Sequence, residues 1–315
     1  MSAAVDREAE KTYPGTIAVS GAAGRFGNLV VRRLHRTDEV LAIDPRPFER
    51  RPSDVDHLPA DLRRRACRDV FRRGRVQAVV HLGPYHMYSR HDEQSFAAAI
   101  ENFDRLLGYC DMYDVEKLVL LSSADVYGAR ARNPQFLTEE APLLAAGLSA
   151  LRDVDMMAQS FFWRRPDVET VILRPTHITG GVGGAMVRYL RMDPVPRLMG
   201  FDPMIQLVHE EDVVRALRLA LAPGRRGIFN LAGPPPLPLS RIVERLGRQT
   251  FSVPHFLAKP ALGQLRRLGR IDIHPSYVDH VRYVCMVDDS RARSTLGYRT
   301  SRDAEETLAA VDLWE

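Results

Sequence analysis

The chain has 315 residues, of which 45% are hydrophobic and 27% charged, the proportions of an ordinary soluble folded protein. Its formal net charge is only +4, and it has no run of about 18 apolar residues, which argues against a membrane-spanning helix. Cys67, Cys110 and Cys285 lie far apart without a zinc-binding spacing, so we expect no structural metal and a reducing, cytoplasmic compartment. Residues 1–14 are polar and predict a disordered tail.

Short apolar runs alternate with helical patterns through the first half of the chain. Strands are predicted at 16–20, 40–43, 76–82, 118–122 and 170–173. Helices are predicted between them at 26–34, 61–72, 95–113 and 147–163. This alternation is typical of βαβ units and predicts an α/β fold with a Rossmann-type, doubly wound parallel sheet.

The pattern loosens after Pro175, where glycines and prolines become frequent. Short strands at 206–208 and 228–231 are expected to return to the main sheet, and a helix is expected at 241–250. We therefore predict a dinucleotide-binding domain at 15–180 with a return segment near 205–233. The smaller C-terminal substrate lobe is predicted at 181–204 and 234–315.

A glycine-rich loop, Gly21-Ala22-Ala23-Gly24-Arg25-Phe26-Gly27, follows the first strand and begins a helix. Glycines there let the backbone approach a pyrophosphate, and the helix N-terminus offers free N–H groups. Asp44 ends the second strand, where an acid accepts hydrogen bonds from ribose hydroxyls and repels a 2′-phosphate. This favours NAD over NADP, although Arg25 or Arg46 could instead pair with a phosphate. A purely structural glycine turn is the alternative.

The later motifs resemble those of the extended short-chain dehydrogenase/reductases, the NAD-dependent epimerase/dehydratase group that acts largely on nucleotide sugars. The resemblance runs from about residue 16 to 313 and rests on the order of its landmarks. These are the glycine loop, Ala60-Asp61-Leu62, His81-Leu82-Gly83, Ser122-Ser123-Ala124-Asp125-Val126-Tyr127-Gly128, and Leu173-Arg174-Pro175-Thr176-His177-Ile178-Thr179-Gly180. The cofactor-binding residues that the resemblance implies, together with Asp44, are Gly21, Gly24, Arg25, Phe26, Gly27, Asp61, Leu62, Leu82, Gly83, Asn102, Ser122 and Pro175.

The chain departs from this family at the catalytic pair. The resemblance makes Ser123 the catalytic serine and places the Tyr-x-x-x-Lys pair near 151 and 155, where this chain has Leu151 and Asp155. In the family the tyrosine exchanges a proton with the substrate and the lysine cation lowers its pKa. The usual hydride chemistry is therefore predicted to be disabled, and the double exchange Leu151→Tyr with Asp155→Lys is expected to restore a trace of NAD reduction where the rest of the site is intact. We expect Arg152 to be the partner of Asp155.

Only three lysines are present, Lys11, Lys117 and Lys259, so the search for the pair is exhaustive. Tyr113 and Lys117 have the required spacing but precede Ser123. We interpret Lys117 as a solvated charge at the start of a strand.

Three functions stay open. The chain is a non-catalytic ligand-binding relative in which Ser123 only positions a ligand, or an enzyme in which Tyr85, His86, His177 or Tyr127 replaces the acid/base. Third, the arginines between Arg46 and Arg75 bind nucleic acid, although a solvated helix face explains them more simply. The expected partners are a small-molecule ligand such as a nucleotide sugar and, from the resemblance, a second copy of the chain paired through the helices 95–113 and 147–163. No membrane partner is expected.

Overall fold

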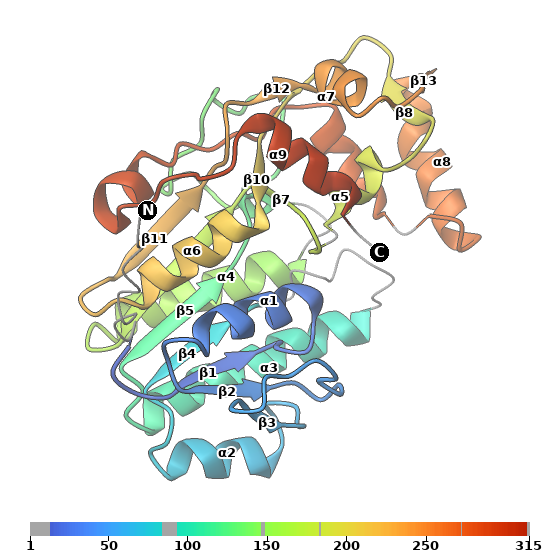
Figure 1. Cartoon of the computed structure of the whole chain (residues 1–315). Coiled ribbons are helices and arrows are strands. Elements are labelled where there is room, and N and C mark those ends of the chain that lie inside the picture. The colour runs from blue at the N-terminus through green and yellow to red at the C-terminus, as the bar shows by residue number, and fades with distance from the viewer. Residues whose placement is uncertain (1–12, 84–92, 146–148, 183, 272, 314–315) are drawn as a thin grey trace, which may run out of the picture.

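The computed structural model describes residues 13–83, 93–145, 149–182, 184–271 and 273–313. Within them a seven-stranded parallel sheet has the strand order β11-β6-β5-β4-β1-β2-β3 (Figure 1). Its strands are β1 (Ile17–Ser20), β2 (Val40–Ile43), β3 (Asp56–Leu58), β4 (Ala78–His81), β5 (Lys117–Leu121), β6 (Glu169–Pro175) and β11 (Gly227–Leu231).

Helices cover both faces of the sheet, which confirms the predicted doubly wound α/β fold. Strand side chains alternate between the faces, so Ile17 and Val19 pack in one core while Ala18 packs in the other. The first face is covered by α1 (Arg25–Leu34) and α6 (Glu210–Leu221) (Figure 1). The second is covered by α2 (Arg65–Arg72), α3 (Glu93–Met112) and α4 (Ser149–Arg164).

A smaller C-terminal region has a third apolar core, to which Tyr127 and Leu137 also contribute. Its strands form three two-stranded pairs, β10 with β7, β12 with β9, and β13 with β8. The strands are β7 (His177–Thr179), β8 (Val195–Leu198), β9 (Met204–Ile205), β10 (Leu207–His209), β12 (Leu237–Pro238) and β13 (Thr250–Val253). The helices are η1 (Ala124–Tyr127), α5 (Ala185–Leu190), α7 (Leu239–Arg245), α8 (His255–Arg267), η2 (Pro275–Val281), η3 (Ala292–Leu296), α9 (Ala304–Ala309) and η4 (Ala310–Asp312).

Two elements of the second half differ from the sequence prediction. The predicted strand at 206–208 does not return to the main sheet, because β11 already occupies the edge of β6 and β10 pairs with β7 instead. The helix expected at 241–250 ends at Arg245, since Gly247 adopts a left-handed φ of 65° and Thr250 begins β13. The other return strand, predicted at 228–231, joins the main sheet as β11.

The topology fixes where a ligand can bind. In a doubly wound sheet, ligands bind beyond the carboxyl ends of the strands, at the point where the strand order reverses. Here that point lies between β1 and β4, which are neighbours in the sheet. The loops after these strands begin at Gly21 and Leu82. No helix in the described part of the chain has the length and apolarity needed to cross a bilayer.

Candidate functional site

The loop between β1 and α1 has the backbone geometry of a phosphate-binding turn. Gly21 has a φ of 82°, a conformation that side chains rarely adopt, and Gly24 is the N-cap of α1 without a side-chain capping bond. A Cβ at Gly27 would lie 2.2 Å from the carbonyl oxygen of Gly21, so only glycine fits there. Because no side chain caps the helix and no acid stands in its first turn, its N–H groups and positive end are available to an anion. These residues fit a dinucleotide.

Asp44 stands at the end of β2 with its carboxylate already held in place. Its side chain is only 2% exposed and accepts four hydrogen bonds, one from the Ala23 amide at 3.1 Å and three from Arg46 at 2.8 to 3.0 Å. Burial raises the pKa of Asp44, but the bonds from Arg46 outweigh it and leave the pKa below its ordinary value. Arg46 therefore pairs with Asp44, and a ribose hydroxyl has to share the carboxylate with it. The other candidate for a 2′-phosphate, Arg25, lies with its Nε close to Gly181.

The remaining implied cofactor residues follow the carboxyl ends of the neighbouring strands. Leu62 and Leu82 are buried, and Gly83 has a φ of 58°, where a Cβ would lie only 2.8 Å from the carbonyl oxygen of Leu121. Asp61 pairs with Arg63, whereas the buried Oδ1 of Asn102 has no hydrogen-bond partner among the residues that the structure describes. An unpartnered buried acceptor is costly, which fits a donor supplied by a bound ligand. Phe26 and Pro175 are buried at the same edge of the sheet, after β1 and at the end of β6.

Asp155 lies on α4 and faces the sheet, where it forms a buried ion pair with Arg174 of β6. The side chains of both residues are 0% exposed, and two hydrogen bonds of 2.7 and 3.0 Å join them. The Ser122 hydroxyl adds a third bond of 2.5 Å to the same carboxylate. The prediction that Arg152 pairs with Asp155 is therefore wrong. Arg152 lies toward solvent and pairs with Asp153, its neighbour on the helix.

Arg174 also belongs to a wider buried network. It donates to the Tyr127 hydroxyl at 2.8 Å, and that hydroxyl donates to Asn230 Oδ1 at 2.8 Å. The backbone N–H of Asn230 donates in turn to Glu139 Oε1. Burial raises the pKa of Tyr127 to about 12, although Arg174 lowers it in part. The Tyr127 hydroxyl is thus an internal hydrogen-bonding group rather than an exposed acid.

The Tyr113/Lys117 pair does not reach the carboxyl edge of the sheet. Lys117 is the first residue of β5, and its Nζ pairs with Glu169 at 2.6 Å and donates to three backbone carbonyls at the amino edge. Lys117 is fully buried, so the prediction of a solvated charge is wrong. Burial lowers the pKa of Lys117, although Glu169 raises it in part. The carbonyl oxygens at the end of α6 accept hydrogen bonds from its ammonium group. Leu151, at the position where the resemblance expects the catalytic tyrosine, is buried in the third apolar core.

A cluster of ionisable side chains lies beyond the carboxyl ends of β5 and β6. His177 Nδ1 is 3.5 Å from Asp125 Oδ1 and 3.2 Å from the Tyr277 hydroxyl. His280 Nε2 is 3.4 Å from the same Asp125 oxygen, and its ring stacks on Tyr277 with centroids 4.6 Å apart. Burial lowers the pKa of His177, an effect that Asp125 opposes. Ser123 is adjacent, and its Oγ accepts the Asp125 amide.

Sequence reasoning found His177 and Ser123 but missed the other members of this cluster. Tyr277 and His280 lie about 100 residues further along the chain, in η2, and no local motif marks them. Tyr85 and His86, the other predicted replacements, lie outside the described residues. Among the described residues, no group of three or more His, Cys, Asp or Glu side chains has a metal-binding arrangement.

The arginines of the stretch 46–75 that have identified partners mostly face acids of the same region. Arg63 pairs with Asp61 and Glu101, and Arg65 and Arg72 both approach Asp69. Such pairs partly neutralise the stretch. Nucleic-acid binding by this surface stays an untested alternative.

Comparison with known proteins supplies the family. The sequence model described as "NAD dependent epimerase/dehydratase family" matches residues 17–232, which is more than half of the chain. The chain belongs to the NAD-dependent epimerase/dehydratase family. An uncharacterized protein of Mycobacterium tuberculosis is 29% identical over 306 residues, which cover 91% of this chain and 80% of that protein. An uncharacterized protein of Mycobacterium bovis matches equally well.

Solved structures of epimerases and dehydratases share the fold. UDP-glucose 4-epimerase from Thermotoga maritima, solved with UDP-glucose, has a TM-score of 0.72 at 20% identity, covering 95% of this chain and 98% of that chain. dTDP-glucose 4,6-dehydratase from Bacillus anthracis, solved with NAD, has a TM-score of 0.70 at 17% identity, covering 95% and 96%. At these identities the likeness shows the fold alone. The register that places Leu151 and Asp155 at the catalytic pair of the epimerase/dehydratase family stays a prediction from the sequence.

Proposed function

We propose that the chain binds NAD along the loop 21–27 and a nucleotide-sugar-like ligand beyond the carboxyl ends of β5 and β6, without the standard tyrosine–lysine proton relay. The observation that carries the cofactor half is the contact at Gly27, where a Cβ would meet the Gly21 carbonyl oxygen at 2.2 Å. Asp44 supports the same half, because its buried carboxylate stands where a ribose is bound in this fold. Family membership supports NAD as the dinucleotide.

Each part of the cofactor has a counterpart among the described residues. The loop 21–27 and the N-terminus of α1 would hold the pyrophosphate, Asp44 the adenosine ribose, and Asp61 with Leu62 the adenine. Pro175, at the end of β6, would lie beside the nicotinamide. NAD supplies a hydride acceptor when bound.

The buried pair Asp155–Arg174 supports the second half of the proposal. Asp155 accepts two bonds from Arg174 and one from Ser122, so its carboxylate serves as a counter-charge inside the fold. A carboxylate in that role neither lowers the pKa of a phenol nor donates to a ribose. We infer that the protein is a ligand-binding relative in which Ser123 positions the ligand.

The cluster around His177 favours a second candidate, an enzyme with a replaced acid/base. The Tyr277 hydroxyl and the Asp125 carboxylate both approach Nδ1 of His177, at 3.2 and 3.5 Å. An imidazole beside a carboxylate can take up a proton from a ligand or donate one to it. Conversion of UDP-glucose into an epimerised or dehydrated product by the NAD-loaded protein would select this candidate, and the absence of any such product across common nucleotide sugars would support the non-catalytic one.

The test of the cofactor site is a calorimetric titration of the full chain with NAD and with NADP. We expect tighter binding of NAD. Asp44→Ala should weaken NAD binding by about 10- to 100-fold, the cost of losing hydrogen bonds to a charged group, and should leave Arg46 to pair with the 2′-phosphate of NADP. Asp54→Ala is the matched control, because Asp54 is an exposed acid of the same domain that pairs with His35. Tighter binding of NADP by the unaltered chain would contradict the proposal.

A further inference from the structure

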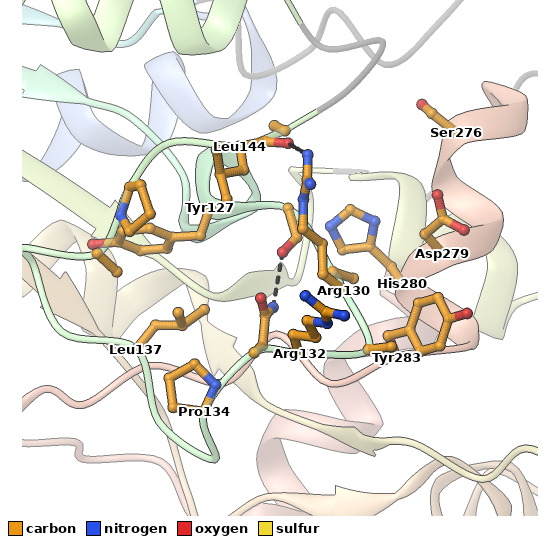
Figure 2. A pocket seen from close by; sticks show the side chains of 17 residues that line it. Tyr127, Arg130, Arg132, Pro134, Leu137, Leu144, Ser276, Asp279, His280 and Tyr283 are labelled. Atoms are coloured by element: carbon orange, nitrogen blue, oxygen red, sulfur yellow. Dashed lines mark hydrogen bonds between the residues drawn. The ribbon is translucent and has the colours of Figure 1, made fainter.

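A cavity of about 670 Å³ lies between the loop that follows η1 and the helix η2 (Figure 2). Its volume is that of a small-molecule site, which typically measures about 300 to 1,000 Å³. The residues that line it are 127–134, 137, 141–142, 144–145, 276, 279–280 and 283. None of them belongs to the loop 21–27 or to the other residues assigned to the dinucleotide.

Most polar groups of the cavity wall already have hydrogen-bond or ion-pair partners within the protein, and these interactions hold the wall in place. Arg130 donates to the Leu144 carbonyl at 2.6 Å, and Asn133 donates to the carbonyls of Gly128 and Val284 at 2.9 and 3.0 Å. Asp279, the acid of the lining, is neutralised by Lys259 at 2.8 Å. The side chains of Arg130 and Arg132 therefore give the lining of the cavity a net positive charge.

Arg132 is exposed at this cavity, and no acid in the described part of the chain forms an ion pair with it. A guanidinium presents its donors in a planar fork that matches the oxygens of a phosphate. The Arg130 guanidinium is held by its hydrogen bond to the Leu144 carbonyl, so Arg132 is the arginine of the wall whose guanidinium is able to reorient toward a ligand.

His280 provides the second, independent observation. It is only 5% exposed, and neither ring nitrogen has a hydrogen-bond partner among the described residues. Its Nε2 lies 3.4 Å from Asp125 Oδ1 without the geometry of a hydrogen bond, and the Tyr277 ring covers one face. A buried polar atom without a partner costs about 1 to 3 kcal/mol. Because His280 lines the cavity, a ligand there can satisfy it (Figure 2).

We propose that this cavity binds a phosphate ester of the size of a sugar phosphate, with Arg132 pairing with the phosphate and His280 hydrogen-bonding to the ligand. A phosphate ion alone fills only a small part of the volume, so the remainder accommodates the organic portion. The inference does not depend on NAD binding, and it rests on the proposed function only where the ligand of the cavity is a nucleotide sugar. It adds a site separated from the Asp125–His177 contact by the His280 ring.

The experiment is a calorimetric titration of the full chain with glucose 1-phosphate, glucose and inorganic phosphate. We expect glucose 1-phosphate to bind more tightly than either of the others. Arg132→Ala should weaken its binding by about tenfold or more. His280→Phe, which keeps the stack on Tyr277, should weaken it as well. Arg241→Ala is the matched control, because Arg241 is an exposed arginine of α7 that pairs with Glu244 outside the cavity.

Competition separates the two sources of the phosphate. Displacement of glucose 1-phosphate by UDP-glucose would identify the ligand as a nucleotide sugar, and lack of displacement would identify a separate phosphate ester. Equal binding of glucose 1-phosphate by Arg132→Ala, equal affinity for inorganic phosphate, or no binding would each overturn the proposal. NAD titrated into Arg132→Ala should bind as it does to the unaltered chain, so failure of this site is distinguishable from failure of the cofactor site.

Discussion

Asp155→Lys, the exchange that would give the chain the lysine of the family's catalytic pair, is expected to destabilise the fold. Asp155 is fully buried against Arg174, with hydrogen bonds of 2.7 and 3.0 Å. A lysine there places a second cation beside a buried guanidinium and removes the acceptor of the Ser122 hydroxyl. The double variant Leu151→Tyr with Asp155→Lys, which the sequence suggested as a rescue, therefore should not restore NAD reduction.

The magnitude follows from the burial of the pair. Removing one partner of a buried ion pair costs about 3 to 5 kcal/mol, because the other charge is left uncompensated. Unfolding entropy near the melting temperature is about 2.1 cal/mol/K per residue, or about 0.66 kcal/mol/K for 315 residues. Dividing the two gives a fall in Tm of about 5 to 8 °C for Asp155→Ala. The Tm of Asp155→Lys should fall further, since the lysine adds a positive charge beside the Arg174 guanidinium.

Thermal melts of the full chain, followed by circular dichroism, measure this fall. Asp153→Lys is the matched control, because Asp153 is two residues away on the same helix, is 36% exposed and pairs with Arg152. We expect it to change stability by no more than about 0.5 kcal/mol, which is under about 1 °C. If the Asp155→Lys protein had the same Tm as the unaltered chain, the argument that Asp155 is the counter-charge of Arg174 would be refuted.

Two further predictions concern the glycine loop and acid stability. Gly27→Ala should abolish measurable NAD binding in calorimetry because its methyl group would meet the Gly21 carbonyl oxygen, whereas Gly108→Ala on α3, where a Cβ meets nothing closer than 3.9 Å, should bind NAD normally. Burial lowers the pKa of His81 from 6.5 to about 4, so the unfolded chain binds more protons between these values, and stability should fall by up to about 3 kcal/mol as the pH drops through them. The pKa values of His177, His209 and His274 are lowered as well. In thermal melts across this pH range, the Tm of His81→Asn should therefore depend less steeply on pH than the Tm of the unaltered chain. A Tm of the unaltered chain that does not change with pH would contradict the prediction.

The sequence predicted the sheet well where strands are apolar on both faces. The runs at 40–43 and 118–122 coincide with β2 and β5 to within a residue because both are buried and flanked by helices with a clear period. β3 was missed. It has three residues at the sheet edge, Asp56, His57 and Leu58, none of them buried, so neither hydrophobicity nor alternation marks it. The pairing of β10 also depended on which strand had already taken the edge of β6.

The candidate site was predictable only where its residues follow one another in the chain. The glycine loop and Asp44 obey local rules of turn geometry and strand ends, so sequence alone placed them. The partner of Asp155 is 19 residues away on a strand, whereas the helix neighbour Arg152 was the obvious choice by proximity in sequence. Glu139 likewise meets Asn230 across 91 residues. Contacts of this range depend on the packing of α4 and the loops against β6 and β11.

The buried charges limit which elements can supply chemistry in this protein. Arg174 sits at the centre of a closed network with Asp155 and the Tyr127 hydroxyl, and the network has no exposed member among the three. Helix α4 contributes to it the Asp155 carboxylate, which neutralises the guanidinium, and the Gln159 side-chain amide, which donates to that carboxylate at 2.8 Å. A proton donor or acceptor for a ligand therefore has to come from other elements. Under the second proposed candidate these groups are Asp125 after β5 and His177 after β6, so that candidate predicts turnover that depends on His177 rather than on any residue of α4.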